Sequence, residues 1–184
     1  ARDRVTRYAQ RLLRHVISDP NCSQCVVVGH SLGTSIATEA LLREGLLATA
    51  RRADHGDAAQ EALKKVDHVF TIGSPIDRIF YLFQADSSFS HRYSRLFEEQ
   101  RLSVELPPFS YSSQKSNTKL VNFWSRFDPI SSPIISLRKN ASDRKDAIQN
   151  IESVPPGIPL PIASHTTYFA DPTVMKPIYW AVMA

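Results

Sequence analysis

A short apolar stretch that runs into the motif Gly-His-Ser-Leu-Gly most constrains what this chain can fold into. Residues 25–28 are Cys-Val-Val-Val, the motif occupies residues 29–33, and a segment with helix-forming residues follows at once. This order predicts a buried strand, a sharp turn and a helix. The turn holds Ser31 in a strained backbone conformation at the carboxyl end of the strand and pushes its hydroxyl outward. Ser31 is therefore a candidate nucleophile.

The two glycines of the motif have a steric explanation. A Cβ at Gly29 or Gly33 is expected to crowd the turn or the contact between strand and helix. Because G-x-S-x-G also occurs by chance, the alternative is an ordinary turn whose serine only caps the helix. The apolar run before the motif and the small residues after it supply the strand–turn–helix context and favour the nucleophile. These small residues are Thr34, Ser35, Ala37 and Ala40.

The length and composition indicate one globular domain that spans residues 1–184. Hydrophobic residues make up 42% of the chain and charged residues 22%, which is enough for a core of its own. The net charge of +4 is modest, and no basic stripe interleaved with aromatic residues points to nucleic acid. No apolar run approaches the ~20 residues that cross a bilayer. The chain starts at Ala1 inside a helical pattern, so we expect it to be a fragment of a longer protein.

The two cysteines, Cys22 and Cys25, form a C-x-x-C pattern. A zinc site would need two further ligands at a matching spacing, and the sequence has no second pair. A redox motif normally opens a helix, whereas Cys25 begins a strand. We therefore expect a small core residue and a loop thiol, with neither a metal nor a cofactor. The lack of a disulfide framework favours a reducing compartment such as the cytoplasm.

The residues before the first strand predict an amphipathic helix over 2–17. Its apolar residues recur every three or four positions, so we expect them to form one buried face. They are Val5, Tyr8, Leu12 and Val16. Arginines lie between them and could contact anionic lipid. A peripheral membrane contact thus stays open, although a solvated face is the default.

After the motif we expect a helix over 32–47, and then a polar surface loop over 48–66 with a short helix near 58–65. Leu47 and Ile36 are expected to face inward on the first of these helices, together with Ala40 or Leu41. Strands are predicted at 66–72, which ends in Gly-Ser-Pro, and at 119–124, which leads to Asp128-Pro129.

The remaining stretches have weaker patterns. Residues 76–118 are rich in phenylalanine and tyrosine, which predicts a cap or lid over a site, although packing of a satellite core explains them equally well. The chain after Ile130 is expected to be irregular through Pro161, with a charged helix or loop near 142–150. Asp171 then reads Asp-Pro with the next residue, which predicts an N-cap for a last helix over 172–182.

A serine hydroxyl needs a base to become a nucleophile, and the base needs an acid that orients it. In enzymes with this kind of elbow the chain order is serine, then aspartate or glutamate, then histidine. Ser31, Asp128 and His165 occur in this order, each just after a predicted strand or in a terminal loop. His165 would accept the serine proton, and Asp128 would hold the imidazole tautomer and stabilise the imidazolium.

Each role has a rival. Asp77 also follows a predicted strand and is the alternative acid. His30 lies next to the nucleophile, but its side chain is expected to point away from the serine proton. His68 is expected at a strand end on the surface, and the other histidines have no strand-end context. The backbone N–H of Leu32 is the expected first oxyanion donor, and the second donor is not assigned.

Four segments carry a resemblance to a known family: VVVGHSLG at 26–33, FTIGSP at 70–75, VNFWSRFDP at 121–129 and SHTTY at 164–168. With them the chain resembles the α/β-hydrolase superfamily, and most of all the class 3 (fungal-type) lipases. The resemblance implies a parallel sheet flanked by helices, a cap between core strands, and the triad named above. The first strands of that family and its oxyanion loop have no counterpart here. We therefore expect an upstream segment or a partner chain to complete the sheet.

These features predict a serine hydrolase that acts on carboxylic esters, with lipid or acyl esters as the substrate class. A thioesterase or an acyltransferase on the same fold is one alternative, because water or another acceptor can attack the same acyl-enzyme. A non-catalytic hydrolase-like module that binds partners through residues 76–118 is another.

Overall fold

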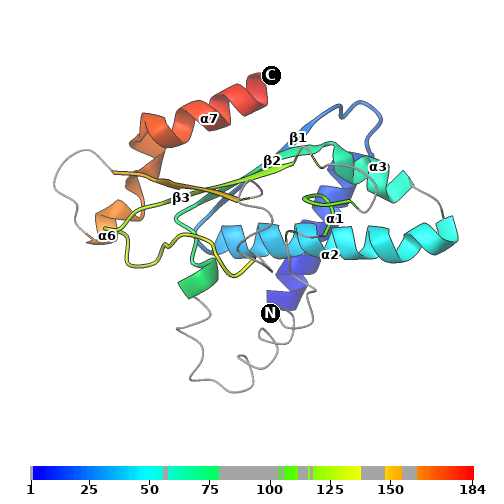
Figure 1. Ribbon diagram of the computed structural model, residues 1–184, viewed down its shortest axis with the longest axis horizontal. Helices are drawn as coiled ribbons and strands as arrows, with labels where there is room; N and C mark the ends of the chain where they lie inside the picture. The colour runs from blue at the N-terminus through cyan, green and yellow to red at the C-terminus, as the bar shows by residue number, and fades with distance from the viewer. Residues whose placement is uncertain are drawn as a thin grey trace, which may run out of the picture.

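The protein is an α/β fold built on a four-stranded parallel sheet with helices on both faces (Figure 1). The computed structural model describes residues 2–55, 58–78, 104, 106–111, 116, 118–137, 148–154 and 161–184. All neighbouring strands are parallel, and the strand order follows the sequence. The strands are β1 (Cys25–His30), β2 (Val66–Ile72), β3 (Lys119–Trp124) and β4 (Ile148–Glu152).

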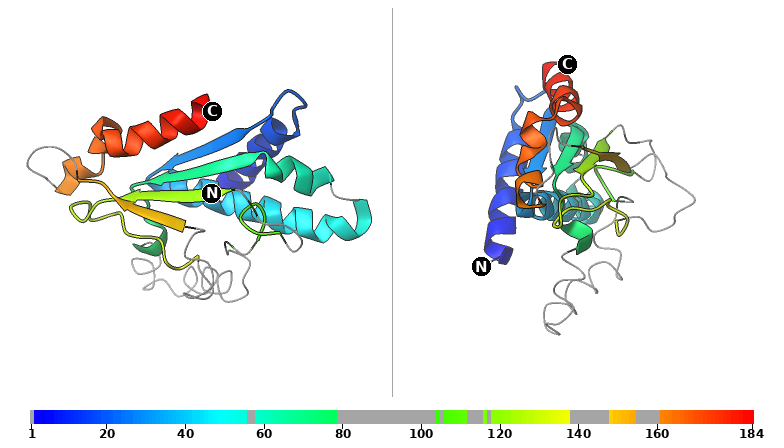
Figure 2. Two further views of the ribbon diagram at one scale, coloured as in Figure 1. Left: turned by 45° about the horizontal axis from the view of Figure 1, so that its top comes forward. Right: turned by 90° about the vertical axis from the view of Figure 1, so that its left-hand side faces the viewer.

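The helices form one layer on each face of the sheet (Figures 1 and 2). The first layer consists of α1 (Arg2–Ser18), α2 (Leu32–His55) and α3 (Ala58–Lys64). The opposite layer is α7 (Pro172–Met183), preceded by the short helix α6 (Pro161–Ser164) and the 3-10 helix η1 (Thr167–Ala170). Both faces of a parallel sheet are normally covered in this way, because its strands are apolar on both sides.

The hydrophobic core has two halves, separated by the sheet. Alternate residues of a strand point to opposite faces, so Val69 packs with Leu41 and Leu63 of the first layer. Its neighbour Phe70 packs with Tyr168 and Val174 of η1 and α7. The predicted strands at 66–72 and 119–124 are confirmed, and so is the capping role of Asp171, whose side chain accepts a hydrogen bond from the Thr173 N–H.

The predicted buried face of α1 is wrong. The helix is present, but its four periodic apolar residues, Val5, Tyr8, Leu12 and Val16, are 40–65% exposed. The opposite arc packs against the rest of the chain, with Thr6, Gln10 and Ile17 buried. Gln10 is tolerated there because its amide donates to Glu44 of α2, which also binds Arg14. The polar inward face follows from this contact between α1 and α2.

Helix α2 and strand β4 also differ from the prediction. Helix α2 continues through residues 48–55, where a loop was expected, because the alanine-rich segment has high helix propensity. Leu47, which was expected to face inward, is 37% exposed, and Ala48, which was expected in the surface loop, is buried. Strand β4 lies where a charged helix or loop was predicted, and its Asn150 is satisfied by Asn122 and by the backbone of Ile134. These bonds exist only once β3 and β4 are paired.

The predicted aromatic cap over 76–118 lies largely outside the described residues. Two described members of that segment, Val104 and Phe109, are buried in the core half beneath α2. Within the part of the chain that the structure describes, no helix has the length and apolar character that crossing a membrane requires.

Candidate active site

Ser31 occupies a sharp turn between β1 and α2, with its backbone in the left-handed region at φ 54°. That conformation is strained for a residue with a Cβ, as the motif predicts. The close approach expected at Gly29 is confirmed, because an added Cβ there would lie 2.8 Å from Thr34 Cα. The same expectation is wrong for Gly33, where an added Cβ would meet nothing within 4 Å. A Cβ at Gly33 would therefore not crowd the contact between strand and helix.

Hydrogen bonds from two neighbouring segments hold this turn in place. The Ser31 N–H donates to the Ile72 carbonyl of β2 at 2.9 Å. The Thr34 hydroxyl donates to the Ser31 carbonyl at 2.7 Å, and its oxygen lies 3.0 Å from Ser74 Oγ. Thr34 and Ser74 are fully buried. The Gly-Ser-Pro turn after β2 therefore braces the backbone that presents the serine.

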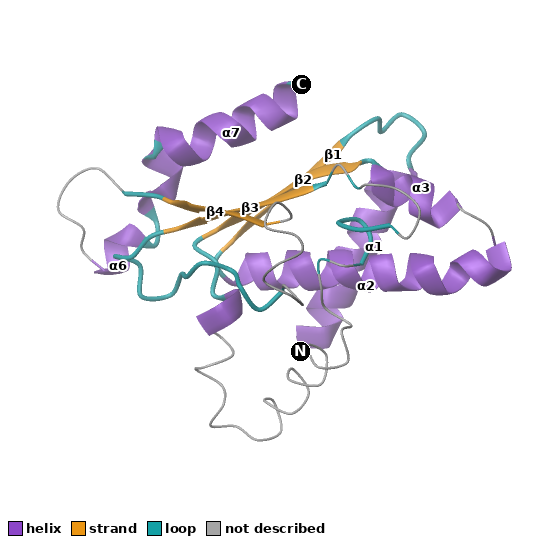
Figure 3. Ribbon diagram, viewed as in Figure 1, coloured by secondary structure: helices purple, strands orange, loops and turns teal. Residues whose placement is uncertain are grey.

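Three side chains from distant parts of the sequence meet at the end of the sheet where the strands finish. Figure 3 shows the strands of this sheet in orange. Ser31 Oγ lies 2.8 Å from His165 Nε2, and His165 Nδ1 lies 2.8 Å from Asp128 Oδ2. Ser31 directly follows β1, Asp128 lies in the loop after β3, and His165 follows α6. Because the strands are parallel, their carboxyl ends lie at the same end of the sheet. The residues that follow β1 and β3 can therefore lie close together.

The chemistry of these groups fixes the direction of both hydrogen bonds. An ionised carboxylate only accepts, so the proton of a neutral imidazole lies on Nδ1 and is donated to Asp128. Nε2 of His165 is then an acceptor and faces the hydroxyl of Ser31. We refer to Ser31, His165 and Asp128 as the row. Its geometry allows the imidazole to take the serine proton.

The surroundings of Asp128 keep it ionised. Its side chain is fully buried, and burial acts to raise the pKa of the carboxyl. Hydrogen bonds from His165, from the Ile130 N–H to Oδ1 at 2.9 Å and from the Tyr168 hydroxyl to Oδ2 at 2.9 Å act the other way. Together they outweigh burial and hold the pKa of Asp128 below its ordinary value of 3.8.

No family model, no characterised protein and no solved structure matches this chain. The functional assignment therefore depends on the contacts of the chain's own residues.

The rival residues have other partners. Asp77 accepts hydrogen bonds from the backbone N–H groups of Ile135 and Ser136 and from the Ser136 hydroxyl, so it anchors a loop. His30 donates from Nε2 to the His165 carbonyl at 3.0 Å, so this nitrogen carries the proton and is engaged with the backbone. Leu32 is the first residue of α2, so its N–H has no acceptor four residues back in the helix.

The other polar candidates from the sequence are His68 and the two cysteines. His68 lies within β2, half-buried, where it pairs with Asp67 and stacks on Phe70, so the prediction of a strand-end surface residue is wrong. Cys22 and Cys25 are free thiols, and burial raises the pKa of the Cys25 thiol. Among the residues that the structure describes, no group of three or more histidine, cysteine or acidic side chains is arranged to hold a metal ion.

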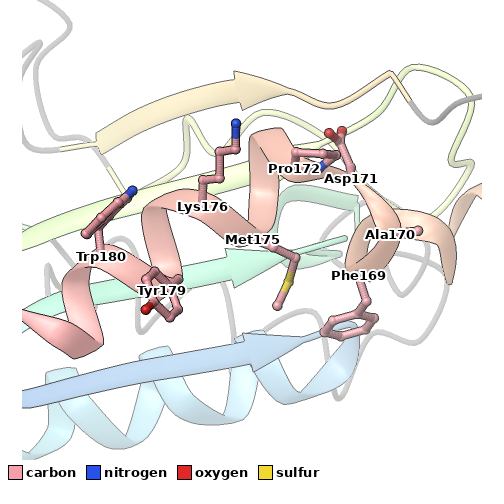
Figure 4. Close-up of a pocket in the computed structure, with 8 residues that line it drawn as sticks. All are labelled: Phe169, Ala170, Asp171, Pro172, Met175, Lys176, Tyr179 and Trp180. Atoms are coloured by element: carbon pink, nitrogen blue, oxygen red, sulfur yellow. The ribbon is translucent and has the colours of Figure 1, made fainter.

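An open, largely apolar hollow of about 510 Å³ lies along η1 and α7 (Figure 4). The ring of Phe169 contacts the ring of His30 edge-on, with centroids 5.1 Å apart. The His30 ring lies equally far from the His165 ring, which connects the hollow to the row of catalytic candidates. In Figure 4 the side chain of Met175 points from α7 to the same side as Phe169.

Sequence reasoning missed three residues beside the row: Gly73, Ser131 and Tyr168. Gly73 has φ 58°, and an added Cβ would lie 3.0 Å from the Tyr168 ring and 3.2 Å from His165 Cε1. Tyr168 lies in the SHTTY segment and Gly73 in the Gly-Ser-Pro turn, so both were in view as motif members. Their contacts to the candidate triad depend on tertiary packing, which no local pattern encodes.

Proposed function

We propose that the chain is a serine hydrolase of the α/β-hydrolase type that cleaves carboxylic esters through an acyl-enzyme on Ser31. The observation that carries this proposal is the continuous row from Ser31 Oγ through His165 to Asp128, with both hydrogen bonds at 2.8 Å. The strained backbone at Ser31 supports it independently, because such strain is found where a side chain must be presented for reaction.

In the first step Ser31 Oγ attacks the ester carbonyl carbon while His165 Nε2 takes the hydroxyl proton. The imidazolium is stabilised by the ionised Asp128. The carbonyl oxygen becomes an oxyanion, to which the Leu32 N–H donates a hydrogen bond. Collapse of this intermediate breaks the bond to the alcohol, which leaves with the proton from His165. Water then attacks the acyl-enzyme with His165 again as base, releasing the acid and restoring Ser31.

The apolar hollow beside Phe169 supports lipid or acyl esters as the substrate class. The hollow lies along η1, which begins shortly after His165 in the sequence, and its lining includes Phe169, Met175 and Tyr179. An acyl chain that lies on these side chains would be removed from water, at about 0.8 kcal/mol for each buried CH₂. Hydrolysis should therefore speed up with acyl length, and Phe169→Ala should reduce that gain more for long esters than for acetate.

We also propose, as part of this function, that an upstream segment or a partner chain pairs with the edge strand β1 and supplies the second oxyanion donor. Ester hydrolysis by residues 1–184 should then become faster when such a segment or partner is supplied, and an unchanged rate would contradict this part of the proposal.

A thioesterase or an acyltransferase would use the same row, and products distinguish them. Matched oxygen esters and thioesters, each assayed with and without an added alcohol, would report which bond is cleaved and which acceptor is used. The non-catalytic alternative gains no support from the contact of 2.8 Å between His165 and Ser31.

The primary test is labelling with a fluorophosphonate, which reacts only with an activated serine. We expect modification of Ser31, its loss in Ser31→Ala and no change in Ser23→Ala, which removes an exposed serine just before β1. A folded wild-type chain that is not labelled at Ser31 would refute the proposal.

A further inference from the structure

We propose that Tyr168 is a positioning residue for the site. Its hydroxyl fixes the Asp128 carboxylate and limits how strongly that carboxylate attracts the proton on His165. This inference rests on the proposed function for its meaning in catalysis, but the contact itself can be tested without any substrate.

The hydrogen bonds around Asp128 show why the phenol matters. Oδ2 accepts from both His165 Nδ1, at 2.8 Å, and the Tyr168 hydroxyl, at 2.9 Å. Oδ1 accepts from the backbone N–H of Ile130. The carboxylate is thus held at both oxygens, and the two side-chain donors converge on one of them. Neither Asp128 nor Tyr168 is exposed by more than 1%, so water does not compete for these bonds.

Ser131 and Gly73 determine where the phenol of Tyr168 lies. Ser131 Oγ lies 2.9 Å from the Tyr168 hydroxyl and is fully buried. Since the Tyr168 proton is donated to Asp128, the phenol oxygen is the acceptor toward Ser131. Ser131 is in turn fixed by the Ser125 N–H at 3.1 Å. The absent side chain of Gly73 leaves room for the rings of Tyr168 and His165 side by side.

Two donors on one carboxylate oxygen share its negative charge. The hydrogen bond from Tyr168 stabilises the ionised carboxylate and leaves less charge to stabilise an imidazolium at His165. It thereby favours the neutral imidazole, which is the form that accepts the serine proton. Burial, as the largest cause, raises the pKa of Tyr168, so the phenol keeps its proton and remains a donor.

The decisive variant is Tyr168→Phe, which keeps the ring and removes the hydroxyl. We expect the acid limb of the kcat/KM profile to move to higher pH, because the freed carboxylate binds the imidazolium more strongly. We expect kcat to fall about tenfold, because a carboxylate that has lost one of its two side-chain donors no longer holds the imidazole in a single orientation, with KM nearly unchanged. The same rise should appear in an NMR titration of the His165 ring nitrogens.

A purely structural role predicts the opposite sign. If Tyr168 only supported the loop, its loss would free Asp128 from His165, and the imidazole would become easier to deprotonate. A shift of the acid limb or of the NMR titration to lower pH, or no shift, would overturn the inference. Ser131→Ala, which keeps the phenol, should shift the titration in the same direction by less, and it decides the question if Tyr168→Phe does not fold.

The control is Tyr8→Phe, which removes an equivalent hydroxyl from the exposed face of α1 and should change nothing. The two proposals fail separately. A wild-type chain without esterase activity or labelling at Ser31 refutes the function, and the NMR titration of Tyr168→Phe still tests the contact. An active wild type with an unshifted Tyr168→Phe refutes only the role of Tyr168.

Discussion

Two regions of the sheet differ in how their polar groups are hydrogen-bonded: the end that holds the candidate site and the edge at β1. At the site, the buried carboxylate of Asp128 accepts three hydrogen bonds from within the chain. At the edge, β2 is the one strand among the described residues that pairs with β1, and Val28 in the middle of β1 is 47% exposed. The apolar stripe of α1 is exposed on one face, and Trp180 of α7 on the other.

The difference separates a buried site with several internal hydrogen-bond partners from a strand edge that is partly exposed. The hydrogen bonds that prepare the row from Ser31 to Asp128 require no other molecule. Within the described ranges, the outer side of β1 has no strand partner, and a strand edge of this kind can pair with another strand.

Removal of the base should break the site without disturbing the fold. His165→Ala should lower kcat/KM for an ester by about 10⁴- to 10⁶-fold, the range found when the acid or the base of a triad is removed. Denaturant unfolding should change little by comparison, since the side chain bonds mainly to the other members of the row. An equal residual activity in both proteins would show that the row is not catalytic.

Two large-to-small substitutions on α1 should separate its buried face from its exposed stripe. Ile17→Ala should lower the free energy of unfolding by about 2–5 kcal/mol, because it leaves a cavity in the core. Leu12→Ala removes a similar side chain from the exposed stripe and should cost less than about 1 kcal/mol. Urea unfolding measures both. A large cost at Leu12 would mean that the stripe is covered, for instance by a second copy of the chain.

The two glycines that flank Ser31 should respond with opposite signs. Gly29→Ala forces a Cβ to within 2.8 Å of the Thr34 backbone and should cost about 1–3 kcal/mol. Gly33→Ala places a methyl group in open space within α2 and should stabilise the chain by about 0.5–1 kcal/mol. Thermal unfolding of the two variants is the measurement. Equal losses would favour the crowding at both glycines that the sequence predicts.

The smallest effect concerns acid stability. The pKa of Asp128 is lowered in the folded chain, so its ionised form stabilises the fold. This stabilisation is present in full at pH values above the pKa of the carboxyl in the unfolded chain. This contribution is lost as pH falls below about 3.8 through the folded-state pKa. Asp128→Asn should therefore show a shallower loss of stability with acid than the wild type. Parallel curves in acid would mean that Asp128 is not held ionised by its partners.

The strands at 66–72 and 119–124 and the cap at Asp171 were predictable because their signals are local: apolar runs, turn residues and an Asp-Pro at a helix start. The order of Ser31, Asp128 and His165 could also be stated from the sequence, although their catalytic role stays a prediction. Strand β4 was missed because two isoleucines among polar residues carry no clear period. The burial of α1 was wrong because periodicity shows that a helix has an apolar face but not which neighbour covers it.

The sequence by itself determined the strained turn at Ser31, since three β-branched residues, a glycine at the point of closest approach and a helix-forming segment act within a few residues of one another. Only the tertiary structure decided that Tyr168 and Ile130 share the carboxylate of Asp128, and that the polar arc of α1 faces inward. Those outcomes depend on contacts between segments far apart in the chain. Their free energies exist only after the sheet and both helical layers have assembled.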